Sequence, residues 1–199
     1  MRWHDFEWEA WRPDETARRL AGIDVPWYVA GGWAIDLFLG CERREHDDLE
    51  IGVPNERFLT AVAPALSDLE LFVTDSGQVI PIAQASDRLA FTHQTWGLDR
   101  AAGVWRIDVF REPSSEGDWI CRRDERIRLA YDELIEHTAD GIPYGRPEVV
   151  LLFKARSARP KDESDLAAVL PQLSPERRQL LAGWIAQVHP GHFWLPDLA

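Results

Sequence analysis

The chain has 199 residues and a net charge of −12, from 22 basic and 34 acidic side chains. With 45% hydrophobic residues it can build a sizeable core, which excludes general disorder. The acidic balance argues against a general binder of nucleic acid, because such proteins present a basic face, and it favours attraction of a cationic small molecule. Acidic residues that serve only solubility explain the charge equally well.

Hydrophobic patterning and turn residues predict a mixed α/β segment over about the first 145 residues. The expected elements are a helix over 15–23, a strand over 27–30, a helix over 33–39, a strand over 49–53, a helix over 55–65, and strands over 71–73, 79–82, 89–93, 104–110 and 119–121. A hairpin is then expected to join 134–137 to 142–144.

Helices dominate the remainder of the chain. They are expected from Pro147 to about residue 157, over 162–170 and over 175–188. We therefore expect residues 1–145 to form a core domain. Residues 146–199 are expected to pack on it, because so short a segment rarely folds alone.

Cysteine content and the N-terminus bear on the compartment. Two cysteines do not make a disulfide framework, and the first residues contain no apolar stretch of the signal-peptide type. The sequence therefore predicts a cytoplasmic protein. The protein is not expected to bind a membrane.

Two acids stand one residue apart in the segment Asp48-Leu49-Glu50-Ile51. On a strand, Asp48 and Glu50 share one face while Leu49 and Ile51 enter the core. Two carboxylates on one face repel unless a cation lies between them, and such oxygen ligands suit Mg²⁺ together with substrate phosphates. A solvated strand edge with both charges facing water is the alternative.

A glycine pair, Gly31-Gly32, separates the expected strand over 27–30 from the helix that follows. Glycine allows the backbone to approach a ligand closely, and the free N–H groups of a helix N-terminus attract phosphate. By itself a glycine pair is more often a simple turn. Placed shortly before the acid pair, it indicates a phosphate site beside a metal site.

A third acid, Asp108, lies in a strand otherwise built from apolar residues such as Ile107 and Val109. A carboxylate there must be paired, capped or bound to a metal. One explanation is an ion pair with Arg106 or Arg111. The other is a third metal ligand that also takes a proton from an attacking hydroxyl.

Together, these residues resemble the signature of the nucleotidyltransferase superfamily. The segments Gly31–Asp36 and Arg44–Glu50 are similar to the two N-terminal motifs of its aminoglycoside 2''-adenylyltransferase-like and lincosamide nucleotidyltransferase-like branch. The strong resemblance covers about residues 27–53. One departure is Glu50, which stands where this branch usually has Asp.

The resemblance implies an α/β (α+β) fold in which helices flank a mixed β-sheet and a C-terminal helical part follows. It also implies two Mg²⁺ ions, an NTP donor and a small-molecule acceptor. The implied reaction moves an NMP, expected to be AMP from ATP, onto a hydroxyl of an aminoglycoside- or lincosamide-like antibiotic and releases pyrophosphate. Nucleic acid is not an expected partner, and the oligomeric state is not predicted.

Site residues follow from the same resemblance. Asp48 and Glu50 would hold the metal ions, and Asp108 would complete one metal site and act as, or orient, the general base. The other residues implied to contact the nucleotide are Gly31, Gly32, Trp33, Arg44 and His46. For Arg44 and His46, supporting the acids is the alternative role. Asp36 is expected to cap or support as well, with a position facing the acceptor as its alternative.

Only two of the 22 basic residues are lysines, Lys154 and Lys161. Such scarcity is typical of a GC-rich genome, so a retained lysine favours a function, and Lys154 is predicted to reach the triphosphate. Related nucleotidyltransferases, including abortive-infection-type toxins, have a comparable Lys … Lys-Asp-x-x-Asp segment. The alternative is a solvated helix in which Lys161 pairs with Asp165.

Other hypotheses stay open at this point. The chain could be a toxin-like nucleotidyltransferase that modifies tRNA or protein, or a non-catalytic nucleotide-binding module. His189 and His192 flank Pro190-Gly191, and we expect a turn that docks the C-terminus rather than a metal site.

Overall fold

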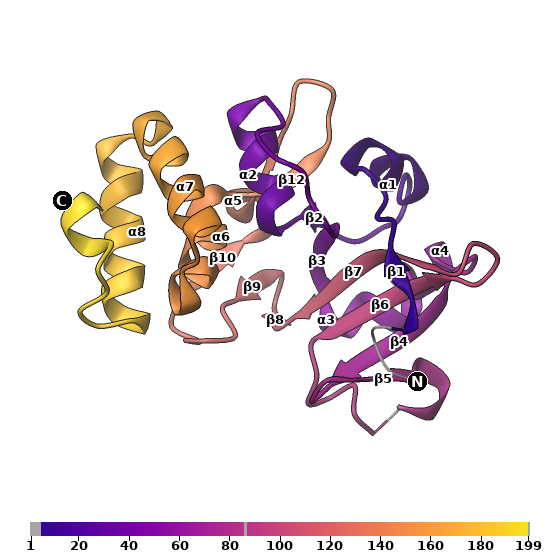
Figure 1. Ribbon diagram of the computed structural model, residues 1–199. Coiled ribbons are helices and arrows are strands. Elements are labelled where there is room, and N and C mark those ends of the chain that lie inside the picture. Colours follow the sequence, from indigo (N-terminus) through magenta and orange to yellow (C-terminus); the bar gives the residue numbers. More distant parts are fainter. Residues whose placement is uncertain (1–4, 86, 199) are drawn as a thin grey trace.

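A computed structural model describes residues 5–85 and 87–198 (Figure 1). Within them, a nine-stranded mixed sheet runs through the molecule, and β1 (Glu7–Trp8) pairs with its strand β7. The other strands follow the order β11 (Ile135–His137), β12 (Pro143–Gly145), β2 (Tyr28–Val29), β3 (Glu50–Pro54), β7 (Val104–Glu112), β6 (Gln94–Asp99), β4 (Glu70–Asp75) and β5 (Gln78–Pro81). A small antiparallel sheet contains β8 (Ser114–Ser115), β9 (Asp118–Ile120) and β10 (Arg128–Ala130).

Helices occupy much of the rest of the described chain. They are α1 (Pro13–Arg19), α2 (Gly31–Leu39), α3 (Asn55–Arg57), a π-helix (Phe58–Val62), α4 (Ala63–Ala65), α5 (Tyr131–Leu134), α6 (Pro147–Lys154), α7 (Pro160–Val169) and α8 (Pro175–Val188). Figure 1 shows α6, α7 and α8 gathered at one end of the molecule and strands β4 to β7 at the other. None of the helices in the described ranges is both long and apolar enough to cross a bilayer.

Helix ends agree with the residues that predicted them. Helix α2 begins at the glycine pair and ends at Gly40, which takes the left-handed conformation (φ 72°) that glycine adopts without strain. Helix α8 begins after Ser174, whose hydroxyl accepts a hydrogen bond from the Arg177 N–H. The helix expected over 55–65 is present, but its middle turn is a π-helix.

The strand expected over 89–93 is wrong. The chain forms turns from residue 87 to residue 91, and the side chain of Phe91 is 88% exposed. The strand is instead β6, which begins at Gln94 and includes Gly97. A Cβ at Gly97 would lie 2.6 Å from Leu69 Cδ1 and 2.9 Å from Ile107 Cγ2, so this glycine marks close packing rather than a strand end.

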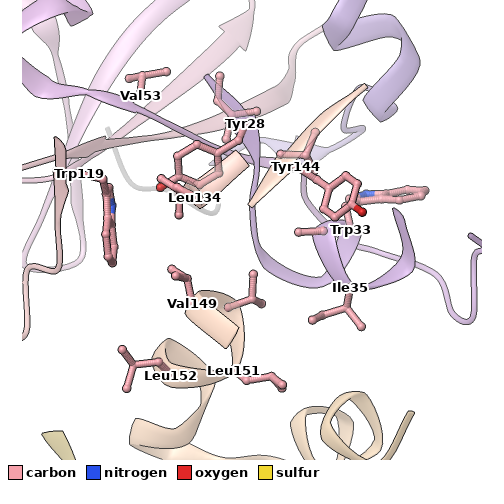
Figure 2. Packing of buried hydrophobic residues seen from close by; sticks show 14 of the residues in the cluster. Tyr28, Trp33, Ile35, Val53, Trp119, Leu134, Tyr144, Val149, Leu151 and Leu152 are labelled. Carbon is pink, nitrogen blue, oxygen red and sulfur yellow. The ribbon is translucent and has the colours of Figure 1, made fainter. Parts of the chain in front are cut away.

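A single large core cluster joins the sheet to the C-terminal helices. Figure 2 shows Tyr28 of β2 and Leu134 of α5 on one side of it and Val149 and Leu152 of α6 on the other. The division at residue 145 stays a prediction, and the residues on both sides of it share this core. The cleft described below opens between these same elements.

Candidate functional site

The sheet brings two of the predicted acids together. Strands β3 and β7 run parallel, and their register pairs Glu50 with Asp108. The N–H of Asp108 donates to the carbonyl of Leu49 at 2.8 Å, which extends the pairing by one residue. On the opposite face of the same strands, Ile51 and Val109 are fully buried, as the alternation predicts.

Charge repulsion and burial perturb both carboxyl groups. Burial, and to a lesser extent the negative charge of Asp48, raise the pKa of Glu50 to about 7, although the nearby cation of Lys154 opposes the rise. Burial raises the pKa of Asp108 well above its usual value, and the charge of Glu50 adds to this effect. The three acids therefore act on one another electrostatically.

Asp108 has an amide as its neighbour rather than a cation. Gln94 Nε2 donates to Asp108 Oδ2 at 2.7 Å, whereas Asp108 Oδ1 is buried and has no hydrogen-bond partner in the described structure. The alternative explanation, an ion pair with Arg106 or Arg111, is wrong, because Arg106 pairs with Asp99 at 3.2 Å and Arg111 donates to hydroxyl and carbonyl oxygens. Asp108 Oδ1 therefore has no hydrogen-bond partner, although the Trp96 indole lies near enough to lower the pKa of this carboxyl.

These carboxylates suit a divalent cation in their chemistry. Mg²⁺ prefers carboxylate oxygens, and a cation would compensate the buried, mutually repelling charges of Glu50 and Asp108. Across residues 5–85 and 87–198, no three Asp, Glu, His or Cys side chains lie together closely enough to hold a metal ion, so the structure does not gather Asp48, Glu50 and Asp108 into one ligand set. Metal binding by these three acids stays a prediction, and Asp108 Oδ1, which has no hydrogen-bond partner, is the oxygen that could bind.

The Gly-Gly turn packs directly against Glu50. Gly31 has a φ of +60°, and a Cβ at this position would lie 1.5 Å from Glu50 Oε2. The N–H of Ala30 also donates to the Glu50 carbonyl at 2.8 Å. The N-terminus of α2 and the acid on β3 are therefore neighbours, as the phosphate-and-metal interpretation requires.

Residues beside the second glycine support the turn. A Cβ at Gly32 would lie 2.2 Å from Arg44 Nη2 and 2.7 Å from the ring of His46. His46 Nε2 lies 2.7 Å from Asp36 Oδ2, and its ring stacks on Trp33 with centroids 4.4 Å apart. The supporting role of Asp36 is confirmed, while phosphate contact by Arg44 and His46 stays a prediction.

A cleft of about 480 Å³ opens beside Glu50 and Gly31, between the sheet and α6. Its cationic lining residues are Arg122, Arg123, Lys154, Arg156 and Arg159. Its acidic lining residues are Glu50, Glu112 and Asp162. The cleft is thus basic in an otherwise acidic chain, and it suits phosphate groups better than a cationic ligand.

Aromatic rings and guanidinium groups form one wall of this cleft. The Arg122 guanidinium lies 5.1 Å from the ring centroid of Phe110 and 4.3 Å from that of Phe153, and it pairs with Glu112. Arg123 lies 4.6 Å from the same Phe153 ring, and burial lowers its pKa to about 10. Flat surfaces of this kind stack on nucleobases.

Two buried acids hold Lys154 at the cleft. Its Nζ lies 2.8 Å from Asp162 Oδ1 and 3.0 Å from Asp165 Oδ2. Arg159 also pairs with Asp162 at 2.8 Å. Lys161 is exposed, and the alternative in which it pairs with Asp165 is wrong, because Asp165 pairs with Lys154.

Other predicted residues lie away from the carboxylates. His192 Nε2 is 2.8 Å from the Ala155 carbonyl, so the turn between His189 and His192 docks on the end of α6 as expected.

The arginines of the cleft were missed by sequence reasoning. Their signal is the adjacent pair Arg122-Arg123, which becomes meaningful only when the fold brings it to Lys154.

The raised pKa of Glu50 predicts a loss of stability on going from pH 4.5 to pH 7 in the metal-free protein. In this range an unfolded Glu releases its proton while folded Glu50 keeps it, so the free energy of unfolding falls as the pH rises, by about 3 kcal/mol in total. Urea denaturation at pH values on either side of this range measures the fall. Glutamine does not titrate, so the free energy of unfolding of the Glu50→Gln variant should fall less over this pH range than that of the parent. Equal falls in the two proteins would contradict the raised pKa of Glu50.

Comparison with known proteins adds a family resemblance to this geometry. Residues 15–89 match the family model described as aminoglycoside-2''-adenylyltransferase. Over 87 residues the chain is 34% identical to 2''-aminoglycoside nucleotidyltransferases from Escherichia coli and Klebsiella pneumoniae. The match covers 41% of this chain and 48% of each relative, so the chain spans about half the length of the curated relatives it matches.

Solved structures share the fold over more of the chain. The lincosamide antibiotic adenylyltransferase LnuA, solved with lincomycin bound, has a TM-score of 0.51 and 16% identity and covers 78% of this chain and 90% of its own. The antibiotic-resistance factor ANT(2'')-Ia has a TM-score of 0.54 and 15% identity and covers 88% of both chains. The same factor in complex with adenylyl-2''-tobramycin has a TM-score of 0.53 and 15% identity and covers 88% of this chain and 94% of its own.

These findings confirm two expectations. The chain resembles the aminoglycoside and lincosamide branch of the nucleotidyltransferases, and its fold class is the mixed α/β fold of that branch. The matched family segment contains the Gly-Gly turn, Asp48 and Glu50 but ends before Asp108. The roles of the individual site residues therefore depend on the geometry described above.

Proposed function

We propose that this chain is a nucleotidyltransferase that moves AMP from ATP onto a hydroxyl of a small-molecule antibiotic and releases pyrophosphate. The observation that carries the proposal is the meeting of three features at one place. Glu50, paired with Asp108, packs against the glycine turn at the start of α2, and both Glu50 and that turn line the basic cleft.

The cleft supplies the donor site. Backbone N–H groups at the start of α2 would bind the triphosphate, because the first N–H groups of a helix have no partner within it. Lys154 and Arg159 bring positive charge to the same cleft. Phe110, Phe153 and Arg122 offer the base a surface to stack on.

The carboxylates supply the chemistry of transfer. Asp48, Glu50 and Asp108 would hold Mg²⁺, which when bound polarises the α-phosphoryl group and makes a hydroxyl a better nucleophile. Asp108 would complete one metal site through Oδ1, which has no hydrogen-bond partner, and would act as, or orient, the general base through Oδ2, to which Gln94 donates.

The antibiotic class follows from the relatives. The matched family and the curated relatives carry the name of 2''-aminoglycoside transfer, and one structural neighbour is a lincosamide adenylyltransferase. We therefore propose an aminoglycoside- or lincosamide-like acceptor, and resistance to that antibiotic as the biological consequence.

A pyrophosphate-release assay tests the proposal. The protein is incubated with ATP and Mg²⁺ and with tobramycin or lincomycin, and the products are identified by mass spectrometry. Release that requires both Mg²⁺ and an acceptor, together with an acceptor heavier by one AMP, is the expected result. ATP binding without any turnover would instead indicate a non-catalytic module, and labelling of RNA in place of the antibiotic would overturn the small-molecule assignment.

The two lysines provide a matched test of the donor site. Lys154→Met removes a cation from the cleft and leaves Asp162 and Asp165 with fewer partners, so we expect weaker ATP binding, by about tenfold to 100-fold, and a lower melting temperature. Lys161→Met is the control, because this side chain is exposed. Calorimetry with ATP measures both variants, and equal affinities would exclude Lys154 from the site.

A further inference from the structure

Asp165 of α7 is a buried carboxylate with three cations around it. Its side chain is 2% exposed. Lys154 Nζ lies 3.0 Å from its Oδ2, Arg44 Nη2 lies 3.7 Å from the same oxygen, and Arg43 Nη1 lies 3.5 Å from its Oδ1. One negative charge therefore pairs with three positive charges, which come from two separate segments of the chain.

The two segments carry different parts of the proposed donor site. Lys154 is the last residue of α6 and lines the basic cleft. Arg44 belongs to the loop between α2 and β3, and its Nη2 is the atom that a Cβ at Gly32 would meet at 2.2 Å. Asp165 thus lies between the ammonium that we propose binds the triphosphate and the guanidinium that packs on the glycine turn at the start of α2.

Further hydrogen bonds fix the loop between α2 and β3. Arg43 Nη2 donates to Ser164 Oγ of α7 at 3.1 Å, and the backbone N–H of Arg43 donates to Asp36 Oδ2 of α2 at 3.1 Å. Helices α2 and α7 also contact each other (Figure 1). The loop is therefore attached to both helices at once, and Asp165 lies at the point of attachment on α7.

Charge alone argues against an acid at this position. A carboxylate beside an anion-binding site repels the anion, so Asp165 would weaken the binding of a triphosphate if its charge were its only effect. Lysine and arginine side chains are long and flexible, however, and holding them in place before the ligand arrives lowers the cost of ordering them on binding. A buried acid with three cationic partners supplies such a fixed arrangement.

We propose that Asp165 is a positioning residue of the donor site, which fixes the spacing between Lys154 and the glycine turn and so prepares both for the triphosphate. It acts through these partners and does not touch the nucleotide. The inference rests on the proposed function and adds to it a residue of α7. It makes this helix part of the donor site, although α7 follows the predicted core domain in the sequence.

Replacing Asp165 by asparagine in the full chain separates positioning from charge. The amide has nearly the same shape without the negative charge, so a purely electrostatic role predicts tighter binding of ATP, whereas the positioning role predicts weaker binding. We expect calorimetry to show the Kd of ATP, with Mg²⁺ present, rising about tenfold. The Kd of tripolyphosphate should rise by the same factor, because the phosphates and not the base use this spacing.

Steady-state kinetics provide a second measurement on the same variant. In the pyrophosphate-release assay the KM for ATP should rise, while kcat and the KM for the acceptor stay within about twofold of the parent. General damage to the fold would lower kcat and affect both substrates.

Glu148→Gln is the matched control for damage to a buried ion pair. Glu148 is fully buried at the start of α6 and pairs with Arg146 and Arg177. This variant should lower the melting temperature, as Asp165→Asn does, and leave the Kd values of ATP and tripolyphosphate unchanged.

Arg43→Met tests the same attachment should Asp165→Asn fold poorly. The side chain of Arg43 is 27% exposed and contacts Ser164 and Asp165, so its loss loosens the loop without altering a residue that lines the cleft. Tripolyphosphate binding should weaken about threefold, as the loss of one partly exposed ion pair implies. Unchanged binding in this variant would contradict the proposal.

Other results would also overturn the inference. They are unchanged or tighter binding of ATP by Asp165→Asn, a fall in kcat without a change in the KM for ATP, and equal weakening of ATP binding by Glu148→Gln. The parent protein decides the proposed function separately. If the parent releases pyrophosphate with an acceptor, the proposed function stands whatever Asp165→Asn does, and if the parent neither binds ATP nor releases pyrophosphate, the proposed function itself fails.

Discussion

Replacing Asp108 by asparagine is expected to lower kcat by about 10³-fold while raising the melting temperature. The substitution removes the group that we propose takes the proton and contributes a metal ligand. It also removes a carboxyl whose ionised form is disfavoured by burial and by the charge of Glu50. Because the folded state no longer carries this cost, activity and stability change in opposite directions. Pyrophosphate release with ATP, Mg²⁺ and an acceptor antibiotic measures the first effect, and thermal unfolding of the metal-free protein measures the second.

Asp99→Asn is the control for this prediction. Asp99 lies in β6, next to β7, and the pKa of its carboxyl is lowered, chiefly by a hydrogen bond from the Ala102 N–H. Its amide variant should therefore leave kcat unchanged and lower the melting temperature slightly. The account fails if Asp108→Asn keeps kcat within about tenfold of the parent, a loss too small for a catalytic carboxylate, or if both variants change stability in the same direction.

Replacing Gly31 by alanine is expected to remove most of the activity at a modest cost in stability. The new Cβ would meet Glu50 Oε2 at 1.5 Å, and the Glu50 side chain can relieve this contact only by turning its carboxylate away from its position. The positive φ adds backbone strain of about 1–2 kcal/mol. We expect a loss of about 100-fold or more in kcat/KM, because the displaced carboxylate is a proposed metal ligand.

The Gly40→Ala variant separates the effect of backbone strain from the effect of displacing the Glu50 carboxylate. Gly40 ends the same helix with a φ of +72°, and a Cβ there would meet nothing within 4 Å. It should therefore cost similar stability and leave kcat/KM unchanged. A Gly31→Ala/Glu50→Asp double variant, with a shorter acid, should recover part of the activity. If Gly31→Ala and Gly40→Ala have the same kinetics, the contact between the turn and Glu50 is not functional.

Sequence reasoning was most successful where single residues determine the local structure. The glycine pair and Gly40 marked both ends of α2, and the alternation around Ile51 and Val109 predicted which faces of β3 and β7 are buried. The same alternation singled out Asp108, a lone acid among apolar neighbours, and the structure pairs it in register with Glu50, while its functional role stays a prediction. These signals are local, so they need no knowledge of the tertiary structure.

What the sequence did not predict depends on contacts between distant segments. The apolar residues over 89–93 predicted a strand there, but the strand β6 begins at Gln94, where Gly97 packs closely against Leu69 and Ile107. The net charge of −12 favoured a cationic ligand, yet Arg122 and Arg156 come together with Lys154 in a basic cleft. Charge counted along a chain does not reveal how it is distributed around a site.

A crystal structure with a non-hydrolysable ATP analogue and Mg²⁺ tests the central claim most directly. The account predicts that Mg²⁺ binds to Asp48, Glu50 and Asp108 and that the triphosphate lies between the start of α2 and Lys154. A nucleotide bound elsewhere, or bound in the cleft with Asp108 turned away from the metal, would contradict it.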